Sequence, residues 1–279
     1  QTVLAYVTFL ARSLSPNSIG SYLNVVRLMH MEQGFCNPLD QWELQAVIKG
    51  IKRLHASPTK QKLPITVDLL ISIHSHLDLG NSEQSAFWAA CLIAFYGFLR
   101  KSSLLPKSFK TSDKALCIKD ISLKADMLLL RIRHTKTIQF GQRTLEIPLA
   151  AIPGSTLCPV SAVSRMLACL PPGAVTPNQP LFSYTTGGSG ILFINHTKFV
   201  NTLKLVLKTC DVDSSKYSGH SFRRGGCTFA FSLGIPSLLL KLRGDWRSEA
   251  YERYVDIKSE QNVIIANTIA SAVKCYKAS

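Results

Sequence analysis

The sequence predicts a mainly α-helical (α+β) protein: a small N-terminal helical domain followed by a larger helical domain that contains one small antiparallel sheet. Two observations lead to this fold class. Apolar residues recur at helical spacing through much of the 279-residue chain. That spacing gives way to alternating apolar and polar residues around residues 127–149, as expected for strands. Because 46% of the residues are hydrophobic, a packed core can form, and general disorder is excluded.

The N-terminal domain is predicted over residues 1–57. Ser15 and Pro16 form a helix start, with serine as the N-cap and proline at the first helical position. Apolar residues then follow helical spacing across residues 15–33. A second helix is expected near residues 40–55, with apolar residues on one face and basic residues on the other.

A linker is predicted over residues 58–64, which combine proline, lysine and small polar residues. The second domain then covers residues 65–279. Its expected helices span residues 67–77, 87–99, 159–170, 196–210, 221–233, 236–243, 248–257 and 259–275.

A β-hairpin is predicted from strands over residues 127–134 and 143–149, joined by a loop that ends near Gly141. Arg131 and Arg133 alternate with apolar neighbours, so one face of the sheet should be buried.

The longest uncharged apolar run, residues 86–99, is 14 residues long. A membrane span needs roughly 18 or more such residues, so the run predicts a buried helix and no membrane association. Arg100 follows directly. It could face the interior to bind an oxyanion, or simply cap the end of a buried helix.

Charge and cysteine usage bound the function further. Lysine and arginine total 32 against 17 acidic residues, a net charge of +15 that favours a polyanionic partner such as nucleic acid over an anionic membrane surface. Eight scattered cysteines without a CxxC pair argue against a disulfide framework or a zinc ribbon and favour reduced intracellular thiols.

Several residue types that suit phosphate chemistry recur in the second domain. His220 and Arg223 are three apart at a predicted helix start, where free N–H groups attract anions. Lys136 lies in the hairpin loop, and Tyr251 and Tyr254 are three apart on a predicted helix. Each pattern alone also fits a surface helix start, a solvated loop lysine or half-buried packing tyrosines.

The order Arg, hairpin Lys, HxxR, GxW and Tyr resembles the catalytic set of the tyrosine recombinase (phage integrase) family. The segments Leu157 to Val160, Gly219 to Gly226 and Gly244 to Ser248 look most like recombinases of eukaryotic DIRS-like and Crypton-like mobile elements. The resemblance spans nearly the whole chain. It implies an N-terminal DNA clamp, a catalytic domain and a location in the nucleus.

The resemblance also implies a role for each matching residue. Tyr254 would attack the scissile phosphate and form a 3′-phosphotyrosyl link. Lys136 would protonate the departing 5′ oxygen, and His220 would assist proton transfer. Arg100 and Arg223 would hold the phosphate oxygens, to which guanidinium groups are well matched. Trp246 would contact the phosphate, and Tyr251 is the rival nucleophile.

No metal-ligand cluster is apparent in the sequence, and the resemblance implies a metal-free reaction without a cofactor. The expected partner is double-stranded DNA, bound by a homo-oligomer of four subunits on two DNA sites. The C-terminal amphipathic helix would dock either on a neighbouring subunit or on its own core. The cations expected to contact DNA are Lys49, Lys52, Arg53, Lys60, Lys62 and Arg224.

Two positions differ from the family pattern. Ser103 stands where many members carry an acidic residue, three positions after the first arginine. Asp245 stands where histidine or tryptophan commonly follows the glycine. The phosphate contact is therefore assigned to Trp246, eight residues before Tyr254. An aspartate beside a phosphate would repel it unless its side chain turned away.

Three functions therefore remain open from the sequence. The first is an active site-specific recombinase. The second is a catalytically silent, domesticated DNA-binding protein, and the third is a type IB topoisomerase. The intact set of catalytic residue types favours the first, and the GxW motif with the compact helical N-terminal domain favours a recombinase over a topoisomerase.

Overall fold

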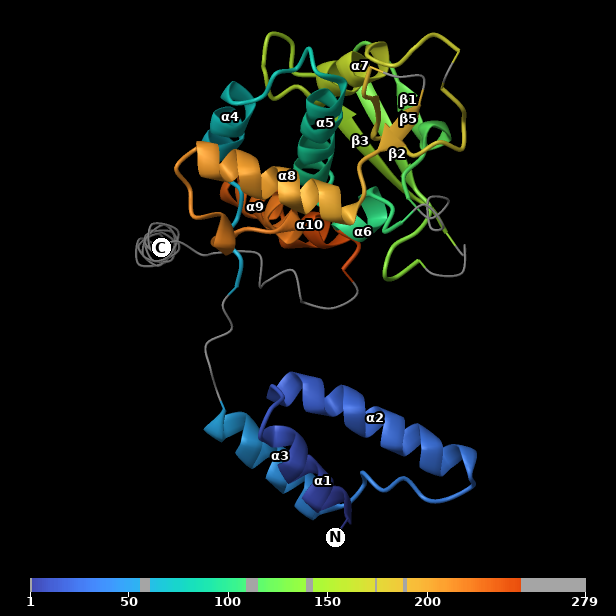
Figure 1. Ribbon diagram of the computed structural model, residues 1–279, viewed down its shortest axis with the longest axis vertical. Helices are drawn as coiled ribbons and strands as arrows, with labels where there is room; N and C mark the ends of the chain where they lie inside the picture. Colours follow the sequence, from blue (N-terminus) through green and yellow to red (C-terminus); the bar gives the residue numbers. More distant parts are fainter. Residues whose placement is uncertain are drawn as a thin grey trace, which may run out of the picture. The chain divides into compact units, whose positions relative to one another are not determined.

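The computed structural model describes residues 2–55, 61–108, 115–138, 143–173, 175–187 and 190–246. Contacts within the chain divide it into two compact units, Gln1–Lys60 and Gln61–Ser279. Helices dominate both units, and a small antiparallel sheet lies in the second (Figure 1), which confirms the predicted fold class.

The first unit is built from three helices, α1 (Thr2–Ala11), α2 (Pro16–Glu32) and α3 (Trp42–Leu54). The structure confirms the helices expected over residues 15–33 and 40–55, and Ser15 is the N-cap ahead of Pro16. The sequence analysis did not predict α1. The three helices enclose a small core made of Val7, Leu10, Ile19, Leu23, Leu44 and Ile51.

The second unit is organised around α5 (Ser82–Tyr96), whose residues from Ser85 to Phe95 are all buried. This confirms a buried helix within the apolar run, although the helix begins five residues earlier than predicted. The Asn81 side chain accepts hydrogen bonds from the N–H groups of Glu83 and Gln84, and this cap fixes the earlier start. Helix α5 contacts α7, α9 and β4 (Figure 1).

Further helices of this unit confirm the predicted ones within a few residues at each end. They are α4 (Val67–Ser75), α7 (Pro159–Ala168), α8 (His196–Thr209), α9 (Gly219–Ser232) and α10 (Ser237–Arg243). A short helix α6 (Lys101–Leu104) and the 3-10 turns η2 (Ile118–Asp120) and η3 (Ser214–Lys216) were not predicted.

The predicted hairpin is confirmed as β2 (Met127–Ile132) paired with β3 (Leu145–Ala150) in antiparallel register. Its Leu128, Leu130 and Ile132 side chains are buried, as the alternation predicted. Two features were missed because their strands are only three residues long. These are a third strand, β1 (Ile121–Leu123), on the other edge of β2, and a separate pair formed by β4 (Ser183–Thr185) and β5 (Ile191–Phe193).

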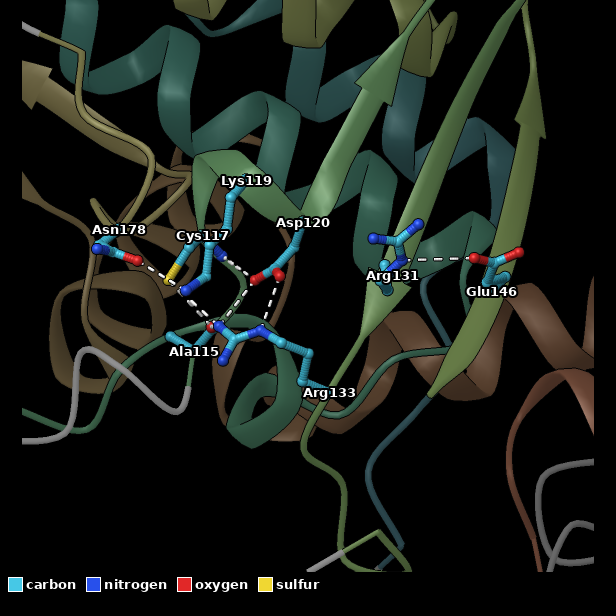
Figure 2. Close-up of polar contacts among 8 residues, drawn as sticks. All are labelled: Ala115, Cys117, Lys119, Asp120, Arg131, Arg133, Glu146 and Asn178. Atoms are coloured by element: carbon cyan, nitrogen blue, oxygen red, sulfur yellow. Dashed lines mark hydrogen bonds and ion pairs between the residues drawn. The ribbon is translucent and has the colours of Figure 1, made fainter. Parts of the chain in front are cut away.

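An ion pair fixes the chain just after β2. Arg133 donates from Nε and Nη2 to the two carboxylate oxygens of Asp120, at 2.7 and 2.8 Å, and from Nη2 to the carbonyl of Ala115 (Figure 2). Asp120 is buried, so this bidentate geometry satisfies a charge that would otherwise be costly. Arg131 and Glu146, also drawn in Figure 2, form an exposed pair that contributes little.

The last residues of the predicted linker 58–64 belong to the second unit. The N–H groups of Leu63 and Ile65 donate to the carbonyls of Lys216 and Ser221. Arg224 donates to the Gln61 side chain at 2.7 Å. Residues 61–64 are therefore bound to the second unit rather than spanning between domains.

Parts of the prediction lie outside the described residues. These are the helices expected over residues 248–257 and 259–275, together with Tyr251, Tyr254 and Lys60. Across the described ranges, no helix is both long enough and apolar enough to cross a bilayer.

Helix α9 approaches its neighbours backbone to backbone through Gly225 and Gly226. A Cβ on Gly226 would lie 2.0 Å from the carbonyl oxygen of Phe95 in α5, and one on Gly225 would lie 1.9 Å from that of Ile65. Both distances are far below van der Waals contact, so glycine is required at each position.

We expect Gly226→Ala to destabilise the second unit by at least about 2 kcal/mol, because α9 must move away from α5 to admit the methyl group. Urea unfolding measures this. The matched control is Gly190→Ala in the same unit, where no atom lies within 4 Å of the added Cβ, so stability should change by less than about 0.5 kcal/mol. Equal stability of the two variants would contradict the close packing.

Candidate active site

Arg100 begins the short helix α6 as its N-cap residue. Helix α5 has already ended at Tyr96, and the turn between them passes through Phe98 with φ of 49°. Arg100 is partly buried, and its side chain makes no hydrogen bond or ion pair with another described residue. It therefore does not cap α5, and the alternative of an arginine placed to receive an anion fits the structure better.

His220 and Arg223 lie on the first turn and a half of α9. Ser218 is the N-cap: its hydroxyl accepts from the His220 N–H, and the Ser221 hydroxyl accepts from the Ser218 N–H. This reciprocal pair fixes the helix start. A spacing of three residues puts His220 and Arg223 on the same side of the helix.

The starts of α6 and α9 lie against each other. A Cβ built on Gly219 would be 3.1 Å from Cδ of Lys101, so glycine lets the lysine stem pack on the helix start. Because Lys101 follows Arg100 and Gly219 precedes His220, this contact brings the predicted arginine and histidine into one neighbourhood.

Arg223 is 1% exposed, and its guanidinium is fixed from three directions. It donates to the carbonyl of Phe98, and to the carbonyl of Gly244 at 2.7 Å. Its Cζ lies 3.7 Å from the centroid of the Trp246 ring, in a cation–π contact. The side chain is thus held in one orientation between the α5–α6 turn and the segment that follows α10.

The Gly244-x-Trp246 pattern has a steric cause. A Cβ on Gly244 would lie 1.8 Å from the Trp246 ring, so the ring folds directly over the glycine. The indole of Trp246 is therefore buried, and it contacts the guanidinium of Arg223 directly.

Positive charge gathers around His220. Desolvation of the imidazole, followed by the charges of Arg223, Arg100 and Lys101, lowers the pKa of His220 below its ordinary value. The imidazole is therefore mostly neutral at pH 7 and has one nitrogen able to accept a proton. Cations gathered beside a neutral imidazole suit a phosphate group.

Lys136 lies in the loop that follows β2, where its side chain is exposed. Its two neighbours, Thr135 and Thr137, both donate hydroxyl hydrogen bonds to the carboxylate of Asp245. The structure thus connects the hairpin loop with the segment that carries Trp246.

The carboxylate of Asp245 turns toward the hairpin, where Thr135, Thr137 and Arg143 all donate to it. Burial would raise the pKa of Asp245, but these hydrogen bonds and the charge of Arg143 outweigh it and lower the pKa. Its charge is thereby compensated by three donors, which resolves the expected repulsion of a phosphate. Sequence reasoning missed this cluster, although threonines on both sides of a candidate lysine were a visible signal.

The cations expected to contact DNA have different surroundings. Lys49, Lys52 and Arg53 are exposed on α3, away from the buried Leu44 and Ile51. In the second unit, Lys62 donates to the Ser215 carbonyl at 2.6 Å. Arg224 is 9% exposed and binds Gln61 and the carbonyl of Lys62, so it holds the start of the second unit rather than facing solvent. Lys60 is outside the described residues.

Ser103 is buried in α6, one turn after Arg100. Tyr254 and Tyr251 lie outside the described residues, so the nucleophile has no described position. Within the described part of the chain, no three His, Cys, Asp or Glu side chains are grouped as metal ligands would be.

Among known proteins, the chain is similar to integrases and recombinases. No protein-family model matches the chain. An integrase/recombinase xerD homolog of Selenomonas ruminantium is 22% identical over 266 residues, covering 92% of this chain and 73% of that protein. Among solved structures, the Tn1549 transposon integrase in complex with transposon right end DNA has a TM-score of 0.62 at 14% identity, over 96% of this chain and 84% of that one. The XerH site-specific recombinase bound to palindromic difH substrate has a TM-score of 0.58 at 12% identity, over 95% and 68%.

The chain therefore has the fold of these recombinase and integrase structures, mainly helical with a small antiparallel sheet. The relative that is similar in sequence is likewise an integrase/recombinase.

We expect the NMR titration midpoint of His220 to lie below that of free histidine, and Arg100→Gln to raise it by removing one nearby charge. The folded chain then binds this proton less readily than the unfolded chain. The free energy of unfolding should therefore fall as the pH drops from 7 toward 5, and His220→Gln should reduce that fall. A midpoint at the free-histidine value, unmoved by Arg100→Gln, would contradict the charge cluster.

Proposed function

We propose that this protein is a site-specific DNA recombinase that cuts and rejoins DNA through a 3′-phosphotyrosyl intermediate. The similarity to an integrase/recombinase and to recombinase structures supports an enzyme of DNA strand cleavage and rejoining. One observation carries the proposal: Arg100, His220, Arg223 and the loop that contains Lys136 lie in the same region of the second unit.

The proposed reaction balances without an external energy source. The Tyr254 oxygen forms a bond to phosphorus as the bond from phosphorus to the 5′ oxygen breaks. Lys136 gives a proton to that 5′ oxygen, and neutral His220 assists proton transfer at the phosphate. Arg100 and Arg223 stabilise the charge on the non-bridging oxygens, a contribution on the order of 10²–10³ in rate for each fixed donor.

Several features support double-stranded DNA as the substrate. The net charge of +15 suits a polyanion, and α3 presents Lys49, Lys52 and Arg53 on its exposed face. In this proposal the first unit grips the duplex while the second unit carries out the chemistry.

We also propose assembly of four subunits on two DNA sites. Residues of α9 and α10 leave an apolar groove that includes Phe229, Leu233, Ile235 and Leu239. Such a groove fits an apolar helix from a neighbouring subunit. The resemblance of the motif segments to DIRS-like and Crypton-like recombinases supports an origin in a eukaryotic mobile element and action in the nucleus.

A catalytically silent DNA-binding protein is the second candidate, with a type IB topoisomerase a further one. The difference at Ser103 favours the silent form, because no carboxylate of α6 orients Arg100. The compensation of the Asp245 charge favours an active enzyme, because this residue no longer opposes a bound phosphate.

We expect Tyr254→Phe to abolish the covalent protein–DNA adduct and to leave DNA affinity within about twofold, because the cations that bind phosphates remain. Duplexes that the protein retains are first selected from a randomised pool and then prepared as nicked suicide substrates. A denaturing gel measures the covalent adduct that forms on them. Tyr251→Phe is the matched control and should keep the adduct. Loss of the adduct in the control alone would transfer the nucleophile to Tyr251, and a wild-type protein that binds but forms no adduct would favour the silent form.

Replacing Lys49, Lys52 and Arg53 by glutamine should weaken DNA binding and reduce its dependence on salt. Each lost phosphate contact lowers the slope of log affinity against log salt by about 0.9. Fluorescence anisotropy at several salt concentrations measures this slope. Replacement of three exposed cations on other surfaces of the protein serves as the control. An unchanged slope in the α3 variant would show that this face does not contact the backbone.

A further inference from the structure

Asp245 connects two parts of the candidate site that are far apart in sequence. It follows Gly244 at the end of α10 and adopts φ of 52°, a left-handed conformation that aspartate tolerates. Its N–H donates to the carbonyl of Leu242, which closes the helix end. The chain thereby turns back, and the carboxylate is buried, with 7% of the residue exposed.

That carboxylate organises the loop that carries Lys136. Thr135 donates its hydroxyl to Asp245 Oδ2 at 2.6 Å, and the same hydroxyl oxygen accepts from the N–H groups of Thr137 and Ile138 at 3.1 and 3.0 Å. The Thr135 N–H donates to the carbonyl of Ile138 at 3.1 Å. Lys136 therefore lies inside a closed turn whose side-chain anchor is Asp245.

Described residues before and after Lys136 are held by ion pairs. Before it, Arg133 is bound to the buried Asp120 (Figure 2). After it, Arg143 donates to the second oxygen of Asp245. The carboxylate of Asp245 thus receives hydrogen bonds from the threonines on both sides of Lys136 and from Arg143, so the position of the lysine depends on it.

The residues on either side of Asp245 contact the other half of the site. The carbonyl of Gly244 accepts from Arg223, and the ring of Trp246 lies on the same guanidinium. Three consecutive residues thus join the phosphate-binding arginine to the loop of the general acid.

We propose that Asp245 is a positioning residue that holds the Lys136 loop in register with Arg223, so that Lys136 can protonate the departing 5′ oxygen. This inference rests on the proposed function, since it assigns a partner to the general acid of that reaction. Asp245 itself does not touch the DNA in this account.

The test separates proton donation from all other steps by changing the leaving group. A duplex with sulfur in place of the 5′-bridging oxygen releases a thiolate, which needs no proton because a thiol has a pKa of about 8.5. Wild-type protein should cleave both duplexes. Lys136→Ala should cleave the oxygen substrate roughly 10²–10⁴-fold more slowly and the sulfur substrate near the wild-type rate.

Asp245→Asn should behave like Lys136→Ala, with a loss of about 10²-fold on the oxygen substrate and recovery on the sulfur substrate. Asparagine retains the left-handed backbone, but its amide presents hydrogen atoms where one oxygen had accepted. The matched control is Asp211→Asn, an exposed aspartate of the same unit with φ of 55°, which should cleave both duplexes at the wild-type rates.

A second readout needs no DNA. Amide hydrogen exchange at Thr137 and Ile138 should accelerate in Asp245→Asn and stay unchanged in Asp211→Asn, while exchange in α5 stays slow in both.

The outcomes distinguish the positioning role of Asp245 from the proposed recombinase function. The positioning role is overturned if the Asp245→Asn variant cleaves both duplexes at the wild-type rate, or if its cleavage rate falls by the same factor on both. Either result leaves the proposed recombinase function intact. Wild-type protein that cleaves neither duplex overturns the proposed function, and the assignment of Asp245 with it. Recovery on sulfur together with faster exchange at residues 137 and 138 supports the inference.

Discussion

The buried guanidinium of Arg223 is the interaction on which the rest of the second unit's site depends. A buried charge is costly unless it is hydrogen bonded, and here the carbonyls of Phe98 and Gly244 and the Trp246 ring surround it. Phe98 lies two residues before Arg100, and Gly244 lies next to Asp245. One side chain therefore fixes both the turn that presents the first arginine and the segment that reaches the hairpin loop.

This arrangement explains how a site assembled from distant segments can be ready before its ligand arrives. The glycines of α9 bring its backbone against Phe95 and Ile65, so the start of that helix cannot shift without breaking the core. The cations near His220 are thus held by packing rather than by the phosphate they would bind. Donors fixed in this way need no reorganisation during a reaction, which is why they stabilise developing charge efficiently.

The sequence predicted most of the helices and the β2–β3 hairpin, because those elements have long runs with a clear period. It could not predict α6, β1 or the β4–β5 pair, whose length of three or four residues carries no period. The order of the motifs pointed to Arg100, Lys136, His220 and Arg223, because order and spacing along the chain can be read directly from the sequence. The pairing of Asp245 with Thr135 was not predictable, because it spans 110 residues and follows from a left-handed turn after α10. For the same reason, the sequence suggested repulsion where the structure has a compensated charge.

The central claim is that one phosphate group is held by Arg100, His220 and Arg223. The most direct measurement is a crystal structure of the protein with tungstate, a tetrahedral dianion that requires no knowledge of the target DNA. The account predicts the anion within hydrogen-bond distance of Arg100 and His220 and facing Arg223, with Lys136 directed toward it. Tungstate bound elsewhere, with this site empty at a concentration that blocks DNA binding, would contradict it.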